Sequence, residues 1–164
     1  MERVAINDTG LDIDHGSLTT RSITDQIVIH HTGNPTDDDL SAAEIDASYK
    51  GQGWSCIGYH YVIRKDGTVE QGRPHWTVGA HAYGHNSHTI GVHVCGNFEI
   101  GEPTSEQIES TAMLLANLCT DYGLTIDRDT IVGHRELMAT ACPGRNLFAQ
   151  MDTIVGKANF YANV

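Results

Sequence analysis

The sequence has no long apolar run, few positive charges and no export signal, and each absence excludes a class of protein. No hydrophobic stretch approaches the roughly 20 residues that a transmembrane helix needs, so we expect no membrane insertion. Lys and Arg number 10 against 21 Asp and Glu, which gives a formal net charge of −11 at pH 7. A chain this acidic is a poor candidate for binding nucleic acid through bulk electrostatics.

The first residues and the cysteines are also informative by what they lack. Residues 1–8 contain no apolar segment of the kind that a secretory signal requires, so we expect synthesis in the cytoplasm; a domain cut from a secreted parent would fit equally well. The four cysteines form no C-x-x-C pair, and a disulfide framework is not expected. Cys56, Cys95 and Cys119 lie in apolar surroundings and are expected to be buried.

The hydrophobic pattern predicts one α/β domain over residues 1–164, because strand-like and helix-like segments alternate without a linker or repeat. Residues 1–25 are polar and weakly patterned, and the first 20 are expected to form an N-terminal arm. We expect a central mixed β-sheet flanked by α-helices. The expected strands are 26–31, 58–65, 68–71, 89–95 and 130–133, with an Asp-Gly hairpin turn at 66–67, and the expected helices are 41–50, 104–122 and 146–160.

Histidine is unusually frequent, with ten residues, and it suits metal ligation and proton transfer. His30 ends one buried strand, and His134 follows another and precedes Cys142 by eight positions. Two imidazoles and a thiolate form three sides of a tetrahedral zinc site, with the open position of a catalytic centre. Spacing alone is a weak signal, since a strand-end histidine is more often an ordinary hydrogen-bonded residue. Neighbours alternate across a strand, so at most one of His30 and His31 should face a metal.

Five motifs follow one another along the chain, at residues 27–33, 58–69, 78–82, 86–92 and 133–144. They read Ile-Val-Ile-His-His-Thr-Gly, Gly-Tyr-His-Tyr-Val-Ile-Arg-Lys-Asp-Gly-Thr-Val, Val-Gly-Ala-His-Ala, Asn with Thr-Ile-Gly-Val, and Gly-His-Arg-Glu…Thr-Ala-Cys-Pro-Gly. Together they resemble the zinc-dependent, type-2 N-acetylmuramoyl-L-alanine amidases, which include T7 lysozyme, endolysin and autolysin domains, and the peptidoglycan recognition proteins. The resemblance spans about residues 20–150 and implies a single amidase domain that hydrolyses the bond between N-acetylmuramic acid and L-alanine in peptidoglycan.

The resemblance also implies the metal ligands. His30, His134 and Cys142 match the three residues that hold one Zn²⁺ ion in the family, whereas His31 matches a variable position. Members that only recognise peptidoglycan commonly lose the cysteine. Because Cys142 is present, hydrolysis is favoured over the alternative, a non-catalytic muropeptide-binding module. A cysteine peptidase is weaker still, because Pro143 offers no backbone N–H for an oxyanion hole.

Further site residues follow from the same resemblance. Tyr59 matches a tyrosine of the catalytic pocket, and Thr140 occupies a position that holds lysine or threonine in the family. His93 stands where one branch carries a catalytic glutamate, and it is expected either to transfer protons or to support other residues. His81 and Asn86 match positions along the substrate groove.

Several other side chains have simpler interpretations. Trp54 and Trp76 are expected to anchor loops to the core, and Arg135 and Glu136 to hold the loop after the second histidine ligand. His60 is expected to pack away from the site. The absence of a signal peptide fits an endolysin of a phage or prophage, which acts on the cell wall after release.

Overall fold

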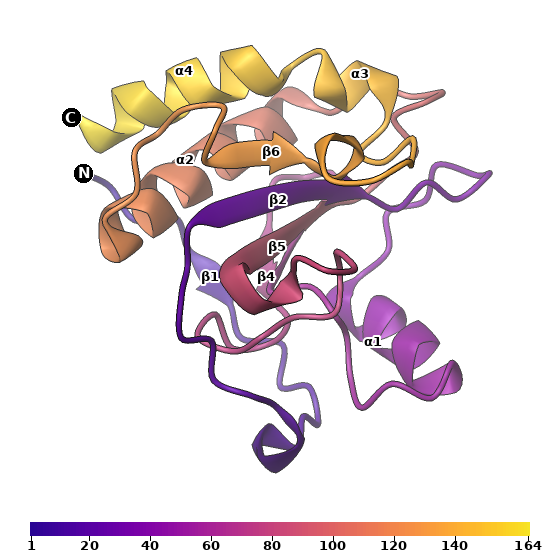
Figure 1. Cartoon of the computed structure of the whole chain (residues 1–164). Coiled ribbons are helices and arrows are strands. Elements are labelled where there is room, and N and C mark those ends of the chain that lie inside the picture. Colours follow the sequence, from indigo (N-terminus) through magenta and orange to yellow (C-terminus); the bar gives the residue numbers. More distant parts are fainter.

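The computed structural model describes residues 1–164 and is built around one six-stranded sheet (Figure 1). Neighbouring strands are parallel, except β3 and β4, which form an antiparallel hairpin. The sheet is therefore mixed, as the sequence predicts. In spatial order the strands are β1 (Ile6–Asn7), β4 (Val69–Gln71), β3 (Tyr61–Ile63), β5 (Thr89–Val94), β2 (Gln26–His31) and β6 (Ile131–Gly133).

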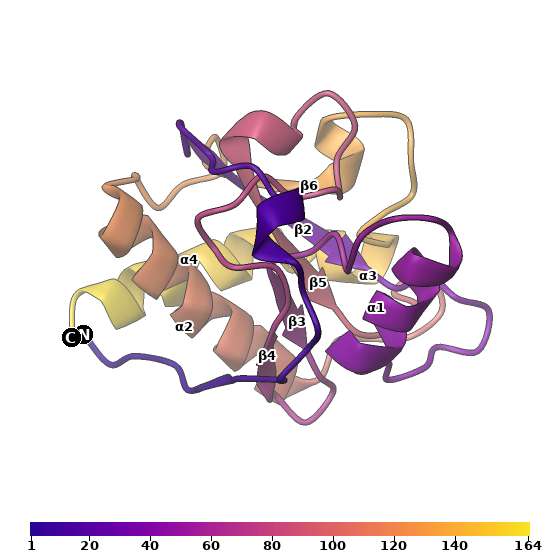
Figure 2. The same ribbon diagram turned by 90° about the horizontal axis from the view of Figure 1, so that it is seen from below.

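Helices cover both faces of this sheet (Figure 2). Helices α2 (Ser105–Tyr122) and α4 (Met151–Ala162) pack together on one face, and α1 (Ala42–Gly51) lies on the other. Capping boxes open α1 and α2, as the Ser-x-x-Glu and Thr-x-x-Gln patterns predict. None of the helices is long and apolar enough to cross a bilayer.

The two faces of the sheet bury different side chains because residues alternate along each strand. Ile27, Ile29 and Val92 belong to the large core under α2 and α4, whereas Val62 belongs to a smaller core with Ala42 and Ile45 of α1. The α1 face is less apolar, and its polar side chains build the site described below. Cys56, Cys95 and Cys119 are buried and unpaired, as expected.

The N-terminal arm differs from the expectation, because residues Ile6–Asn7 form β1 and pair in parallel with β4. Both residues are exposed, so the sequence has no alternation of apolar and polar residues that would predict this strand. The predicted strand over 58–65 is shorter, since the Gly58 and Tyr59 carbonyls accept hydrogen bonds from Ala80 and Arg73 in the loop after β4. The His60 N–H still donates to the Gly91 carbonyl of β5. The predicted helix over 146–160 is two helices, α3 (Arg145–Phe148) and α4, separated at residues 149–150.

Candidate metal centre

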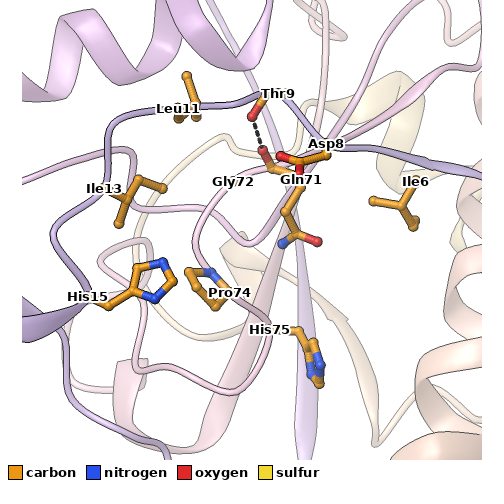
Figure 3. Close-up of a pocket in the computed structure, with 10 residues that line it drawn as sticks. All are labelled: Ile6, Asp8, Thr9, Leu11, Ile13, His15, Gln71, Gly72, Pro74 and His75. Atoms are coloured by element: carbon orange, nitrogen blue, oxygen red, sulfur yellow. Dashed lines mark hydrogen bonds between the residues drawn. The ribbon is translucent and has the colours of Figure 1, made fainter.

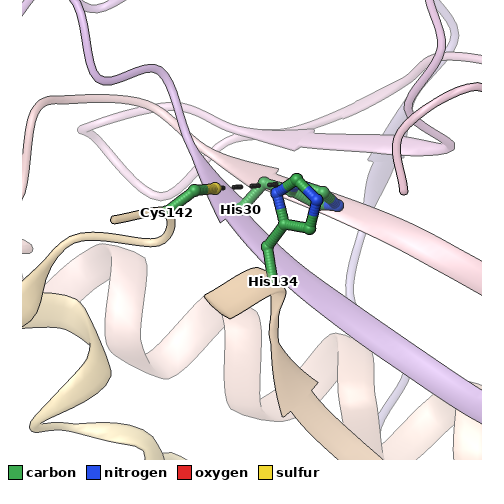
Figure 4. Close-up of side chains that lie close together, drawn as sticks. All are labelled: His30, His134 and Cys142. Carbon is green, nitrogen blue, oxygen red and sulfur yellow. Dashed lines mark hydrogen bonds between the residues drawn. The ribbon is translucent and has the colours of Figure 1, made fainter. Parts of the chain in front are cut away.

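The structure brings His30, His134 and Cys142 together at the carboxyl ends of β2 and β6 (Figure 4). One ligand atom from each side chain lies within 4.8 Å of the other two. The Nδ1 atom of His30 lies 3.6 Å from the Sγ atom of Cys142. Ligand atoms around one tetrahedral zinc ion are roughly 3.5 Å apart, so this spacing suits such an ion with little movement.

The strand pleat selects His30 rather than His31. His30 is 1% exposed and lies on the α1 face of the sheet, with its ring centroid 4.4 Å from that of His134. His31 points to the opposite face, where its Nδ1 accepts a hydrogen bond from the Phe98 N–H at 3.1 Å. Its own backbone N–H donates to Cys142 Sγ at 3.4 Å. The two adjacent histidines therefore have different environments.

The segment between the second histidine and the cysteine is closed by local contacts. The Arg135 N–H donates to the Cys142 carbonyl at 2.7 Å, and the Arg135 guanidinium lies over the Phe148 ring. The Glu136 carboxylate accepts a hydrogen bond from the Gly133 N–H and pairs with Arg128. Both side chains hold the loop, as expected, and bring its end back to its start.

The donor atoms of this cluster are neutral and incompletely satisfied. Nε2 of His134 is buried without a hydrogen-bond partner. Burial lowers the pKa of His30 well below 6.5, with smaller contributions from His81 and His134. Burial also raises the pKa of Cys142 to about 12, against the opposing effect of the His31 N–H. A thiolate here needs nearby positive charge, and two imidazoles with one thiolate suit a cation such as Zn²⁺.

Tyr59 and His93 lie next to the cluster on the same face of the sheet. The ring centroid of Tyr59 lies 5.1 Å from that of His30 and 4.6 Å from that of His93. Burial raises the pKa of Tyr59 well above 10, so its phenol stays protonated. Burial lowers the pKa of His93 to about 3, so its ring is neutral at physiological pH. His93 Nε2 lies 2.8 Å from Thr32 Oγ1, and its Nδ1 is buried without a partner.

A cavity of about 410 Å³ adjoins these two residues and is bounded by α1. Tyr49 and Trp54 line it together with Tyr59 and His93. The anchoring expected of the two tryptophans is wrong, because Trp54 is 53% exposed and Trp76 is 41% exposed. The indole of Trp54 instead offers an aromatic surface to whatever enters the cavity.

The remaining predicted residues lie around the cluster in different ways. His81 is only 8% exposed and lies behind His30 rather than on an open groove wall. Asn86 braces the loop, since its Oδ1 accepts hydrogen bonds from the backbone N–H groups of His81 and Ala82, each at 2.9 Å. Thr140 is exposed, and its Oγ1 accepts a hydrogen bond from the Cys142 N–H at 3.3 Å.

His60 and a second cavity both lie outside the metal cluster. His60 is fully buried away from the cavity, as expected, with its Nε2 2.7 Å from the Thr77 carbonyl. A second cavity, of about 520 Å³, lies between the N-terminal arm and the segment after β4 (Figure 3). Its lining includes Leu11, Ile13 and Pro74 but no member of the metal cluster. Sequence reasoning missed this cavity because the arm has no regular pattern.

Comparison with known proteins shows which family this chain resembles in sequence and fold. A family described as N-acetylmuramoyl-L-alanine amidase matches residues 20–145. The endolysin of Escherichia phage T7 is 35% identical over 132 residues, which cover 77% of this chain and 85% of the phage protein.

Two solved structures extend the comparison. The N-acetylmuramoyl-L-alanine amidase LysC from Clostridium intestinale is 34% identical, with a TM-score of 0.85 over 95% of this chain and 98% of that chain. The ectodomain complex of peptidoglycan recognition proteins LCa and LCx with bound tracheal cytotoxin is similar over 91% of this chain and 95% of that chain, at 28% identity and a TM-score of 0.79. The fold, the converging residues and these matches lead to one conclusion: the chain belongs to the N-acetylmuramoyl-L-alanine amidase family.

Proposed function

We propose that this protein hydrolyses the amide bond between N-acetylmuramic acid and L-alanine in peptidoglycan, with one zinc ion held by His30, His134 and Cys142. The convergence of these three donors in a chain of this family is the observation that carries the proposal. When bound there, zinc would supply a water of lowered pKa and polarise the scissile carbonyl. We propose further that residues 1–164 act as one catalytic domain in cell-wall lysis, as an endolysin would.

Tyr59 is proposed to donate a hydrogen bond to the carbonyl oxygen as negative charge develops on it. Its phenol is protonated at every physiological pH, and its ring packs against His30, so the donor is fixed before substrate arrives. Thr140 is proposed as a weaker donor to the same oxygen. Because its oxygen accepts a hydrogen bond from the Cys142 N–H, its own hydrogen stays free to point outward.

His93 is proposed to support Tyr59 rather than to exchange protons with substrate. Its ring packs against that of Tyr59, and Thr32 holds its Nε2. A ring with a pKa of about 3 is a poor proton acceptor near neutral pH. The leaving amine needs a proton, and the Tyr59 hydroxyl, which lies close to the cluster, is proposed to supply it.

The substrate is proposed to lie in the cavity beside α1, with Trp54 and Tyr49 as its aromatic wall. Sugar rings and peptide stems both pack on exposed aromatic faces. A related structure with bound tracheal cytotoxin supports this choice of ligand. The acidic composition also disfavours a strongly anionic substrate.

The test is hydrolysis of purified peptidoglycan by the zinc-loaded protein, followed by mass analysis of the products. We expect new free amino groups on L-alanine, loss of activity after chelation, and recovery when zinc is returned. Binding of peptidoglycan without any release would support the non-catalytic module instead. Full activity in protein shown to contain no metal would overturn the zinc proposal.

A further inference from the structure

A chain of buried hydrogen bonds runs from His30 away from the candidate metal position. Nε2 of His30 lies 2.8 Å from Nδ1 of His81, and Nε2 of His81 lies 3.2 Å from Oγ1 of Thr89. The Thr89 hydroxyl in turn lies 2.7 Å from the carbonyl oxygen of His85. His30, His81 and Thr89 are 1%, 8% and 0% exposed, so water does not substitute for these contacts.

The carbonyl at the end of this chain fixes the direction of every bond in it. A carbonyl oxygen only accepts, so the Thr89 hydroxyl must donate its single hydrogen to His85. Thr89 Oγ1 can then only accept from His81, which therefore carries its hydrogen on Nε2. A neutral His81 has a lone pair on Nδ1 and accepts from Nε2–H of His30. The lone pair of His30 is then on Nδ1, the atom that faces Cys142.

Both imidazoles are neutral in this argument, and their surroundings support that. Neither ring contacts a carboxylate, and burial disfavours the charged form of each. Without the Thr89 hydroxyl, a hydrogen on Nε2 of His81 would have no acceptor, and the reversed order of hydrogens on the two rings would be favoured. The hydroxyl therefore supplies the asymmetry that selects one tautomer of His30.

The position of His81 is also sterically fixed. A Cβ atom at Gly91 would lie 2.6 Å from Cγ of His81, and one at Gly79 would lie 2.7 Å from its Cδ2. Only glycine leaves room for the imidazole between these two segments. Asn86 holds the backbone of the same loop through the His81 N–H. The ring is therefore confined to a slot that leads to His30.

We propose that Thr89 and His81 are positioning residues that hold His30 as its Nε2–H tautomer, so that Nδ1 is free to bind metal. The tautomer of His30 is a property of the metal-free protein, and only the expected effect of that tautomer on zinc affinity rests on the proposed function. With the tautomer reversed, a hydrogen on Nδ1 would point at Cys142 and block the ligand position. Partners that orient a metal-binding histidine typically change metal affinity by about 10- to 100-fold.

The experiment combines nitrogen-15 NMR of the histidine rings in metal-free protein with zinc affinity measured by chelator competition. In the wild type we expect His30 and His81 each to carry hydrogen on Nε2. In Thr89→Val the His81 Nε2–H would lose its acceptor, so we expect the reversed order, with hydrogen on Nδ1 of His30. Zinc affinity should fall about 10- to 100-fold in Thr89→Val and recover in Thr89→Ser.

Thr111→Val is the matched control, because Thr111 is 1% exposed in α2 and its hydroxyl has no hydrogen-bond partner. It should leave both tautomers and zinc affinity unchanged. A wild-type His30 with hydrogen on Nδ1 would overturn the proposal, as would Thr89→Val binding zinc as tightly as Thr111→Val. Failure of the amidase proposal would instead appear as zinc-loaded wild type that leaves peptidoglycan uncut, with the ring signals unaffected.

Discussion

His30 and His93 are register partners on the adjacent parallel strands β2 and β5, and both lie on the α1 face of the sheet. The Tyr59 ring contacts both imidazoles, with centroid separations of 5.1 Å and 4.6 Å. The candidate metal ligand, the phenol and the second imidazole thus form one packed group. Substitutions at Tyr59 and His93 should therefore distinguish a residue that donates to the substrate from one that only holds the donor in place.

Tyr59→Phe should lower kcat by about 10²–10³, the typical cost of losing one preorganised donor to an oxyanion. The ring remains, so packing against His30 and zinc content should be unchanged. The measurement is turnover of a defined muropeptide, with zinc determined on the same sample. Tyr61→Phe is the control, because Tyr61 lies in the core on the opposite face and should retain full activity. Near wild-type turnover in Tyr59→Phe would refute the donor role.

His93→Ala should cost less activity than Tyr59→Phe, because the ring supports the phenol rather than transferring protons. Its pKa of about 3 also implies that it does not titrate between pH 5 and 8. The acidic limb of the kcat profile should therefore lie at the same pH in this variant and in the wild type. A displaced limb together with a loss as large as that of Tyr59→Phe would assign proton transfer to His93.

Cys142→Ser should abolish zinc binding and hydrolysis while the fold persists. A neutral hydroxyl is a much poorer zinc ligand than a thiolate, and Cys142 belongs to neither hydrophobic core. Zinc content, peptidoglycan hydrolysis and circular dichroism measure the three properties. His30→Ala should behave alike, whereas His31→Ala should retain zinc because its ring contacts Phe98 on the other face. Zinc loss in His31→Ala with zinc retained in His30→Ala would reverse the assignment along β2.

The positions of His30 and His134 at or just after buried strands suggest a site at one edge of the sheet, because parallel strand ends meet there. Cys142 lies nine residues beyond β6, and it is the resemblance to the amidase family that joins it to the two histidines. The strand pleat predicts that only one of His30 and His31 faces the site, and the resemblance to the family identifies that residue as His30. The expected helices over 41–50 and 104–122 correspond closely to α1 and α2, because the capping residues that begin each helix can be recognised in the local sequence.

Other features depend on contacts between distant segments. The bond between His30 and His81 joins residues 51 positions apart, and nothing near either residue indicates it. Trp54 is expected to anchor a loop to the core, yet the segment that follows α1 places it in the lining of the cavity, with its side chain 53% exposed. Strand β1 has only two residues, both exposed, so its pairing with β4 is a consequence of tertiary structure.

Metal-free protein should lose stability as the pH falls from about 6.5 toward 3. His60 and His93 are buried, and burial lowers the pKa of each to about 3. The unfolded chain takes up these protons near pH 6.5, so below that pH it binds more protons than the folded chain. Each histidine then contributes a slope of about 1.4 kcal/mol per pH unit, at most. Urea unfolding between pH 7 and 4.5 measures this slope, and a flat profile would contradict the burial of both rings.

Gly91→Ala should weaken zinc binding although residue 91 touches no metal ligand. The added Cβ would lie 2.6–2.8 Å from ring atoms of His81, so the imidazole must move out of its slot and release His30. We expect a loss of zinc affinity of about 10-fold or more. Gly156→Ala is the matched control, since a Cβ there meets nothing within 4 Å and the residue lies in α4. That change should leave affinity unaltered and raise stability by roughly 0.5–1 kcal/mol. Chelator competition and thermal unfolding on both variants decide the matter: equal zinc affinity in the two proteins would show that His81 does not hold His30 in place.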